Sequence, residues 1–228
     1  MKTCRLGCGA RTIAGVNSLS NHNFNNQTLT NKTFIEIDFI HSSFDGAHLH
    51  NCKFERCTFQ DVSMQECSTT TSWFEECTFN DSTLGGSRHR TTSFINCRFG
   101  NTSMFDVAFL GCRLLGSDFS ETALFSCTIE GGDWSYVNLT NHNLSGQDLQ
   151  EVNFNEADLT GCNLKKVNFE GANLSRANLS HTKLEGANLR GALVEGLDLK
   201  ALDIQGVKVD IPFALAFITA HGGILEDE

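Results

Sequence analysis

A large apolar residue returns every five positions along most of the chain. From residue 19 to residue 209, the positions whose numbers end in 4 or 9 are apolar at 37 of 39 places, and only Thr69 and His89 depart. We call these the central positions. An α-helix repeats every 3.6 residues and a β-strand every two, so neither element explains a period of five.

A small residue stands two places before most central positions, and we call that place the small slot. Eight of the ten cysteines occupy it, and alanine becomes frequent there after residue 157. The other three positions of each five are mostly polar. Two inward residues in every five predict a narrow solenoid, in which each five-residue piece forms one side and ends in a turn. We expect the cysteines to be reduced thiols that pack as small hydrophobes.

Several five-residue segments resemble the pentapeptide-repeat family, whose pattern is A(D/N)LxX. The closest segments are ADLTG (157–161), ANLSR (172–176), ANLSH (177–181) and ANLRG (187–191). The resemblance covers about residues 17–210. It implies an all-β fold, a right-handed quadrilateral β-helix with four pentapeptides, or 20 residues, per coil. Three-sided and six-sided coils remain open from the sequence alone.

Two stretches, NHNFNNQTL (21–29) and NHNLSGQDL (141–149), place large polar residues in small slots. These residues are His22 and Gln27 in the first stretch and His142 and Gln147 in the second. Central positions hold twelve phenylalanines before residue 130 and two after it, when leucine takes over. We therefore interpret 141–149 as a second solenoid start, and expect a junction of two sub-segments near residues 130–150.

The two ends of the chain differ from the solenoid at 17–210. Residues 1–16, with Cys4 and Cys8, are expected to form a tail or cap. In residues 211–228 we expect a short C-terminal α-helix and an acidic tail, because Asp210 can cap the helix, Pro212 suits its first turn and Gly222 can end it. The helix is apolar nearly all round, which favours homodimerisation through it. The residues expected at that contact are Phe213, Leu215, Phe217 and Ile218.

Two departures from the repeat are candidate contact sites. The polar central residues Thr69 and His89 lead us to expect bulges at 67–73 and 85–94, because polar groups are costly to bury. A loop there would project Arg88, His89 and Arg90; a tolerated surface irregularity is the alternative. An exposed apolar patch is expected from residues that follow central positions, unless their side chains flatten against neighbouring coils. These residues are Phe105, Phe125, Ile95 and Leu115.

The charge pattern favours a basic partner. The formal net charge is −10, which disfavours direct nucleic-acid binding. If coils hold 20 residues, one side collects half of the net negative charge of the solenoid, with only Arg98 and Lys200 opposing it. We predict this side as the partner-binding acidic face; the alternative is that its charge only keeps the rod soluble. Its residues are Asp38, Asp61, Asp81, Asp118, Glu121, Asp158 and Asp198.

The chain ends resemble one branch of the family. VDIPFALAFITAHGGIL (209–225) is similar to the end of the MfpA proteins, and NHNFNNQTLTNKTFIEIDF (21–39) to the start of the Qnr proteins. This resemblance implies a dimeric, DNA-mimicking, cytoplasmic protein that binds DNA gyrase or topoisomerase IV and counters topoisomerase poisons such as fluoroquinolones. A structural or adaptor solenoid with an unknown partner is the alternative. We expect no enzymatic activity, cofactor, metal site or membrane segment.

Overall fold

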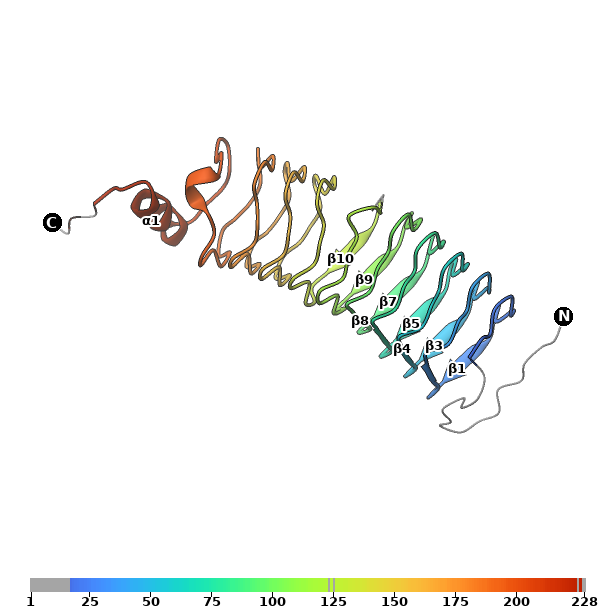
Figure 1. Cartoon of the computed structure of the whole chain (residues 1–228). Coiled ribbons are helices and arrows are strands. Elements are labelled where there is room, and N and C mark those ends of the chain that lie inside the picture. Colours follow the sequence, from blue (N-terminus) through green and yellow to red (C-terminus); the bar gives the residue numbers. More distant parts are fainter. Residues whose placement is uncertain (1–16, 123, 125, 225, 227–228) are drawn as a thin grey trace. The chain divides into compact units, whose positions relative to one another are not determined.

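The computed structural model (Figure 1) describes residues 17–122, 124, 126–224 and 226. The expected tail or cap at 1–16, with Cys4 and Cys8, lies outside the described residues. The chain divides into two compact units, unit 1 (residues 1–132) and unit 2 (residues 133–228). The stretch 141–149 therefore belongs to the beginning of unit 2.

Each coil of unit 1 holds 20 residues. Leu29 pairs with Leu49 and Phe34 with Phe54 in parallel ladders, and isolated parallel bridges join residues 20 positions apart on the other two sides. A coil thus has four sides of five residues, which answers the question of coil size that the sequence left open. We number the four sides on one coil: face 1 (37–41), face 2 (42–46), face 3 (47–51) and face 4 (52–56). Residues that lie 20 positions, or a multiple of 20, before or after these belong to the same face.

Faces 3 and 4 of unit 1 are parallel sheets of three-residue strands (Figure 1), and the middle residue of each strand is a buried central position. Face 3 carries, in spatial order, β1 (Thr28–Thr30), β3 (His48–His50), β5 (Ser68–Thr70), β7 (Arg88–Arg90), β9 (Ala108–Leu110) and β10 (Thr128–Glu130). Face 4 carries β2 (Thr33–Ile35), β4 (Lys53–Glu55), β6 (Trp73–Glu75) and β8 (Ser93–Ile95). The expected all-β solenoid is confirmed.

A corner residue in a left-handed conformation joins successive faces. Asn51 has φ 51°, and glycine occupies many equivalent corners, as these two residues reach this region most easily. The coil imposes the same conformation on less suited residues, including Arg56 (φ 50°) and Glu66 (φ 54°). Corner side chains point away from the core, so charged residues are readily accommodated there.

Stacked aromatic rings fill the core of unit 1. Phe39, Phe59, Phe79 and Phe99 form one column, with successive ring centroids 4.9, 4.7 and 5.0 Å apart and nearly parallel planes. The column on face 4 meets it edge-on, for instance through Phe74 and Phe79 at 5.5 Å. Offset stacking and edge-to-face contacts are the arrangements that aromatic pairs prefer.

The small slots are hydrogen-bond donors as well as spacers. The Cys52 thiol donates to the Leu29 carbonyl at 3.3 Å, and the Ser42 hydroxyl donates to the Leu19 carbonyl at 2.7 Å, in both cases 23 residues back. The eight cysteines of the described part are free and buried, so the expected reduced thiols are confirmed there. Cysteine, serine and threonine recur in this slot because each fills little volume and can donate to the carbonyl of a central residue in the preceding coil.

The expected bulges at 67–73 and 85–94 are wrong. β5 and β7 pair in register, with Thr69 opposite His89, and the coil continues through both stretches. His89 does not project: its side chain is fully buried, while Arg88 and Arg90 lie exposed on a regular strand and not on a loop.

Thr69 and His89 are buried because each satisfies the other. Thr69 Oγ1 donates to Thr92 Oγ1 at 2.9 Å, so it accepts from His89 Nδ1 at 2.8 Å. His89 Nε2 then accepts from the Ser87 hydroxyl at 3.0 Å. The ring also stacks on Phe109, with centroids 5.3 Å apart. A neutral imidazole with both nitrogens bonded removes the penalty that predicted a bulge.

Unit 2 has the same 20-residue coil, joined by isolated parallel bridges such as Asn138 to Asp158. A short 3₁₀ helix η1 (Leu199–Ala201) and the helix α1 (Ile211–Ala220) follow. Asp210 caps α1 by accepting from the Phe213 amide at 3.0 Å, which confirms the expected helix and cap. No helix in the described part is long and apolar enough to cross a membrane.

Candidate functional site

Acidic residues concentrate on faces 1 and 2 of unit 1. These adjacent faces carry eight carboxylates, and Arg98 is the only lysine or arginine on them among the described residues, so their net charge is −7. Faces 3 and 4 of the same unit carry about equal numbers of acidic and basic residues. We call the eight residues the acidic surface: Asp38, Asp45, Asp61, Glu66, Asp81, Asp106, Asp118 and Glu121.

The fold places six of these eight carboxylates in two ways. Asp61, Glu66, Asp81 and Asp106 stand at left-handed corners, with φ between 54° and 60°, so their side chains project. Asp38 and Asp118 stand beside central positions, where Oδ1 accepts from the amide two residues later. One carboxylate oxygen then stays available to a partner, and the hydrogen bond fixes its direction.

Ion pairs cancel charge on face 4 more fully than on the acidic surface. Lys53 lies 2.8 Å from Glu55, and Arg56 lies 3.0 Å from Glu36 and also pairs with Glu55. Among the described residues, the acidic surface has fewer such contacts: Asp106 pairs with Arg88 at 2.9 Å, and Asp61 lies 3.8 Å from His41. Most of the negative charge of faces 1 and 2 is therefore uncompensated.

The predicted acidic face is distributed over both units. Asp38, Asp61, Asp81, Asp118 and Glu121 belong to unit 1, whereas Asp158 and Asp198 belong to unit 2. Asp158 accepts from the Thr160 amide at 3.0 Å, and Asp198 accepts from the Lys200 amide at the start of η1. The face-2 carboxylates Asp45, Glu66 and Asp106 were not predicted. The sequence gives the charge of each side separately, and only the fold shows that faces 1 and 2 form one continuous surface.

The predicted apolar patch is divided. Phe105 is 64% exposed on face 2, whereas Ile95 and Leu115 are half-buried on face 4. Phe125 lies outside the described residues. Among the described residues, Phe105 is the one large, exposed apolar side chain on the acidic surface.

The four residues predicted at the dimer contact differ in exposure. Phe213 is buried, at 2% exposure, and Phe217 is half-buried beside it. Leu215 and Ile218 are 42% and 44% exposed on α1. One side of the helix thus packs on unit 2, and the other presents aliphatic side chains.

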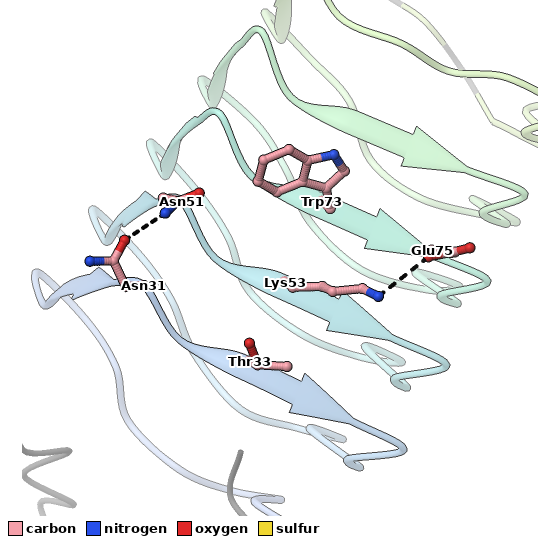
Figure 2. A pocket seen from close by; sticks show the side chains of 6 residues that line it. All are labelled: Asn31, Thr33, Asn51, Lys53, Trp73 and Glu75. Carbon is pink, nitrogen blue, oxygen red and sulfur yellow. Dashed lines mark hydrogen bonds and ion pairs between the residues drawn. The ribbon is translucent and has the colours of Figure 1, made fainter. Parts of the chain in front are cut away.

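A shallow groove of about 500 Å³ opens where faces 3 and 4 of unit 1 meet (Figure 2). The Trp73 indole stands at one end, and Asn51 donates to Asn31 along the corner at 2.6 Å. Lys53, on its wall, reaches both Glu55 and Glu75. The charged groups of this groove are already paired, so it offers no free charge to a ligand.

The cysteines are poor candidates for chemistry. Burial raises the pKa of the Cys67 thiol to about 12 and that of Cys112 to about 11. Such thiols stay protonated at neutral pH, and the thiolate is the form that attacks or binds metals. In the described residues, no group of three histidines, cysteines or carboxylates is placed to hold a metal ion.

Eight copies of the pentapeptide repeat match the chain, over residues 135–165 and 153–191. These copies lie in unit 2, and unit 1 has the same four-sided, 20-residue coil. Residues 135–191 belong to the pentapeptide-repeat family. Residues 14–105 match the family model of the SV2A/B/C luminal domain. No curated protein is significantly similar to the chain in sequence.

Solved structures resemble the chain at low similarity. HetL from the cyanobacterium Nostoc, involved in heterocyst differentiation regulation, is 17% identical, with 86% of this chain and 90% of HetL covered and a TM-score of 0.47. QnrB1, a plasmid-mediated fluoroquinolone resistance protein, is 18% identical, with 92% and 95% covered and a TM-score of 0.35. A pentapeptide repeat protein of the Arabidopsis thaliana thylakoid lumen is 21% identical, with 60% and 84% covered and a TM-score of 0.20. Because these TM-scores are below 0.5, the family assignment rests on the repeat and its coils.

Proposed function

We propose that this protein is a cytoplasmic, non-enzymatic DNA mimic that binds DNA gyrase or topoisomerase IV through the acidic surface. By occupying the DNA-binding region, it would counter poisons that trap the enzyme on DNA, such as fluoroquinolones or a natural toxin. The observation that carries the proposal is the charge separation in unit 1, with a net charge of −7 on two adjacent faces. The sequence resemblance of both chain ends to the MfpA and Qnr proteins supports the choice of enzyme.

The charge density of the acidic surface suits this role. From Asp38 to Glu121 the chain makes about four coils, which span about 20 Å at about 4.8 Å per strand spacing. A net charge of −7 over that length gives one charge per about 3 Å. One strand of DNA carries one charge per about 3.4 Å of helix axis. A groove built to hold phosphates along one strand would therefore meet a similar density of carboxylates.

Neutralising the acidic surface should weaken the effect on gyrase. Changing Asp38, Asp61, Asp81 and Asp118 to asparagine keeps the size of each side chain. At Asp38 and Asp118 it also keeps the Oδ1 acceptor that bonds the backbone. We expect the concentration that half-inhibits supercoiling to rise at least about tenfold, as complementary charges contribute both attraction and steering. The measurement is gyrase supercoiling, with and without a fluoroquinolone, titrated with each protein.

The control removes the same number of charges elsewhere, and should behave as the wild type. It changes four carboxylates of unit 2: Asp148→Asn, Glu151→Gln, Glu195→Gln and Asp203→Asn. Equal loss in both variants would show that only net charge matters and would refute a defined surface. No effect of the wild-type protein on gyrase at micromolar excess would refute the proposed function and favour an adaptor with another partner.

We further infer that α1 forms a homodimer with α1 of a second copy. The helix has ten residues, of which Thr219 alone is polar, and a helix of this length is marginal without packing. Phe213 covers one side by packing on unit 2, but Ile211, Leu215 and Ile218 stay exposed. A second copy offers the same aliphatic surface, and twofold pairing buries both.

Charged substitutions on the exposed side of α1 should separate the dimer. Leu215→Asp combined with Ile218→Asp is expected to raise the dimer dissociation constant at least about 100-fold, because each buried leucine or isoleucine contributes about 1.5–3 kcal/mol. Light scattering should then show half the wild-type mass. The matched control is Ile224→Asp, since Ile224 is 87% exposed beyond the helix. A wild-type protein that is already monomeric would contradict the inference.

A further inference from the structure

A groove beside Phe105 interrupts the acidic surface. The residues that follow central positions on face 2 form a column across the coils, in which Gln65, Gly85 and Phe105 are successive members. Phe105 is 64% exposed, and a groove of about 410 Å³ opens between it and Gln65. We call it the Phe105 groove. Its lining includes Glu66, Thr83 and Asp106.

Gly85 makes the groove, although the fold does not need a glycine there. Its φ lies outside the left-handed region, and an added Cβ would meet only the Phe105 carbonyl oxygen, at an ordinary 3.6 Å. Gly86 differs: it has φ +72°, and an added Cβ would meet the Glu66 side chain at 3.3 Å. Glycine at 85 thus leaves space for a side chain that this chain does not supply.

The charges around the groove indicate what fills it. Glu66 stands on its rim and makes no ion pair within the described residues. Asp106, on the other side, already accepts from the Arg88 guanidinium at 2.9 Å. The groove therefore combines an aromatic face, room for an aliphatic stem and one unpaired carboxylate.

We propose that the Phe105 groove receives an arginine side chain of the partner that the acidic surface binds; this inference rests on the proposed function. The guanidinium stacks on the Phe105 ring and pairs with Glu66. Arginine suits the groove better than lysine because its planar, weakly hydrated head stacks on aromatic rings and forms two parallel bonds with a carboxylate. Phe105 then acts as the anchoring residue of an otherwise electrostatic surface.

Short peptides of equal charge test the groove directly. Hexa-arginine and hexa-lysine are titrated into the full-length protein, and their dissociation constants are compared. The acidic surface attracts both, whereas the groove adds a contact that favours arginine. We expect the wild type to bind hexa-arginine about three- to fivefold more tightly than hexa-lysine, the size of an exposed cation–π contact.

Two variants should abolish this preference by different routes. Phe105→Ala removes the ring, and Gly85→Gln fills the groove with a side chain that the same column already carries at Gln65. Both should bring the ratio of the two constants near one and leave hexa-lysine binding unchanged. Tyr136→Ala, which removes an exposed aromatic residue of unit 2, should keep the wild-type ratio. Equal ratios in the wild type and in both groove variants would overturn the inference.

Gyrase binding by the same variants separates the two proposals. Phe105→Ala and Gly85→Gln should each weaken gyrase binding about tenfold, because a few anchoring residues carry most of the binding energy of an interface. If gyrase binds the wild type and both variants alike, the groove inference fails and the proposed function stands. If gyrase does not bind the wild type, the proposed function fails, and the peptide ratio alone decides the role of the groove.

Discussion

Replacing Gly132 with alanine should lower the free energy of unfolding by about 3 kcal/mol or more. Gly132 has φ +93°, and an added Cβ would lie 2.1 Å from the Cys112 carbonyl oxygen and 3.0 Å from its nitrogen. The obstacle is backbone, which cannot turn aside as a flexible side chain can. Left-handed strain of about 1–2 kcal/mol adds to overpacking of about 1–3 kcal/mol.

Urea denaturation of the purified variants measures the Gly132 effect, and Gly85→Ala is the matched control. Gly85 has an ordinary φ and space for a Cβ, so its substitution should change the unfolding free energy by less than about 0.5 kcal/mol. Equal stabilities of the two alanine variants would contradict the close approach of Gly132 to Cys112.

The buried His89 should make the protein lose stability in weak acid. Burial, together with the nearby positive charge of Arg88, lowers the pKa of His89 from 6.5 to about 3. Between these two values the unfolded chain binds a proton that the folded chain does not. The stabilising contribution is therefore complete above pH 6.5 and is lost as the pH falls, at about 1.4 kcal/mol per pH unit.

The variant His89→Phe should reduce this acid loss. Phenylalanine occupies the equivalent central position at Phe109 in the next coil, so the ring fits the stack, and Thr69 keeps its bond to Thr92. Between pH 6.5 and pH 5, the unfolding free energy of the variant should fall less steeply than that of the wild type. The difference in slope should correspond to about one proton fewer taken up on unfolding. That window lies above the titration of ordinary carboxyl groups. Identical slopes would show that His89 is charged in the folded protein.

The period of five determined most of the architecture. The central positions, the small slots and the burial of His142 at 7% exposure follow from this pattern, whereas the helix after Asp210 was predicted from its capping residues. The number of residues per coil did not follow from the pattern, because a separation of 120 residues between the two NHN motifs divides into coils of several sizes. Only the pairing of residues 20 positions apart decides it.

The errors came from judging residues one at a time. Thr69 and His89 each look unsuited to a core, yet they lie one coil apart and bond to each other. The same holds for the candidate site. In the sequence, nothing marks Glu66 or Gly85 as part of a site. They line a groove only together with Phe105, which lies one coil after Gly85. Contacts between coils join residues about 20 positions apart, and a five-residue motif does not predict such contacts.

The role of the acidic surface as a DNA mimic is tested most directly by competition. Labelled duplex DNA is bound to gyrase, and the wild-type protein is added while DNA anisotropy and protein binding are followed together. We predict that the protein displaces the DNA and that its apparent dissociation constant rises in proportion to the DNA concentration. A ternary complex, in which the protein binds gyrase and the DNA stays bound, would contradict the account.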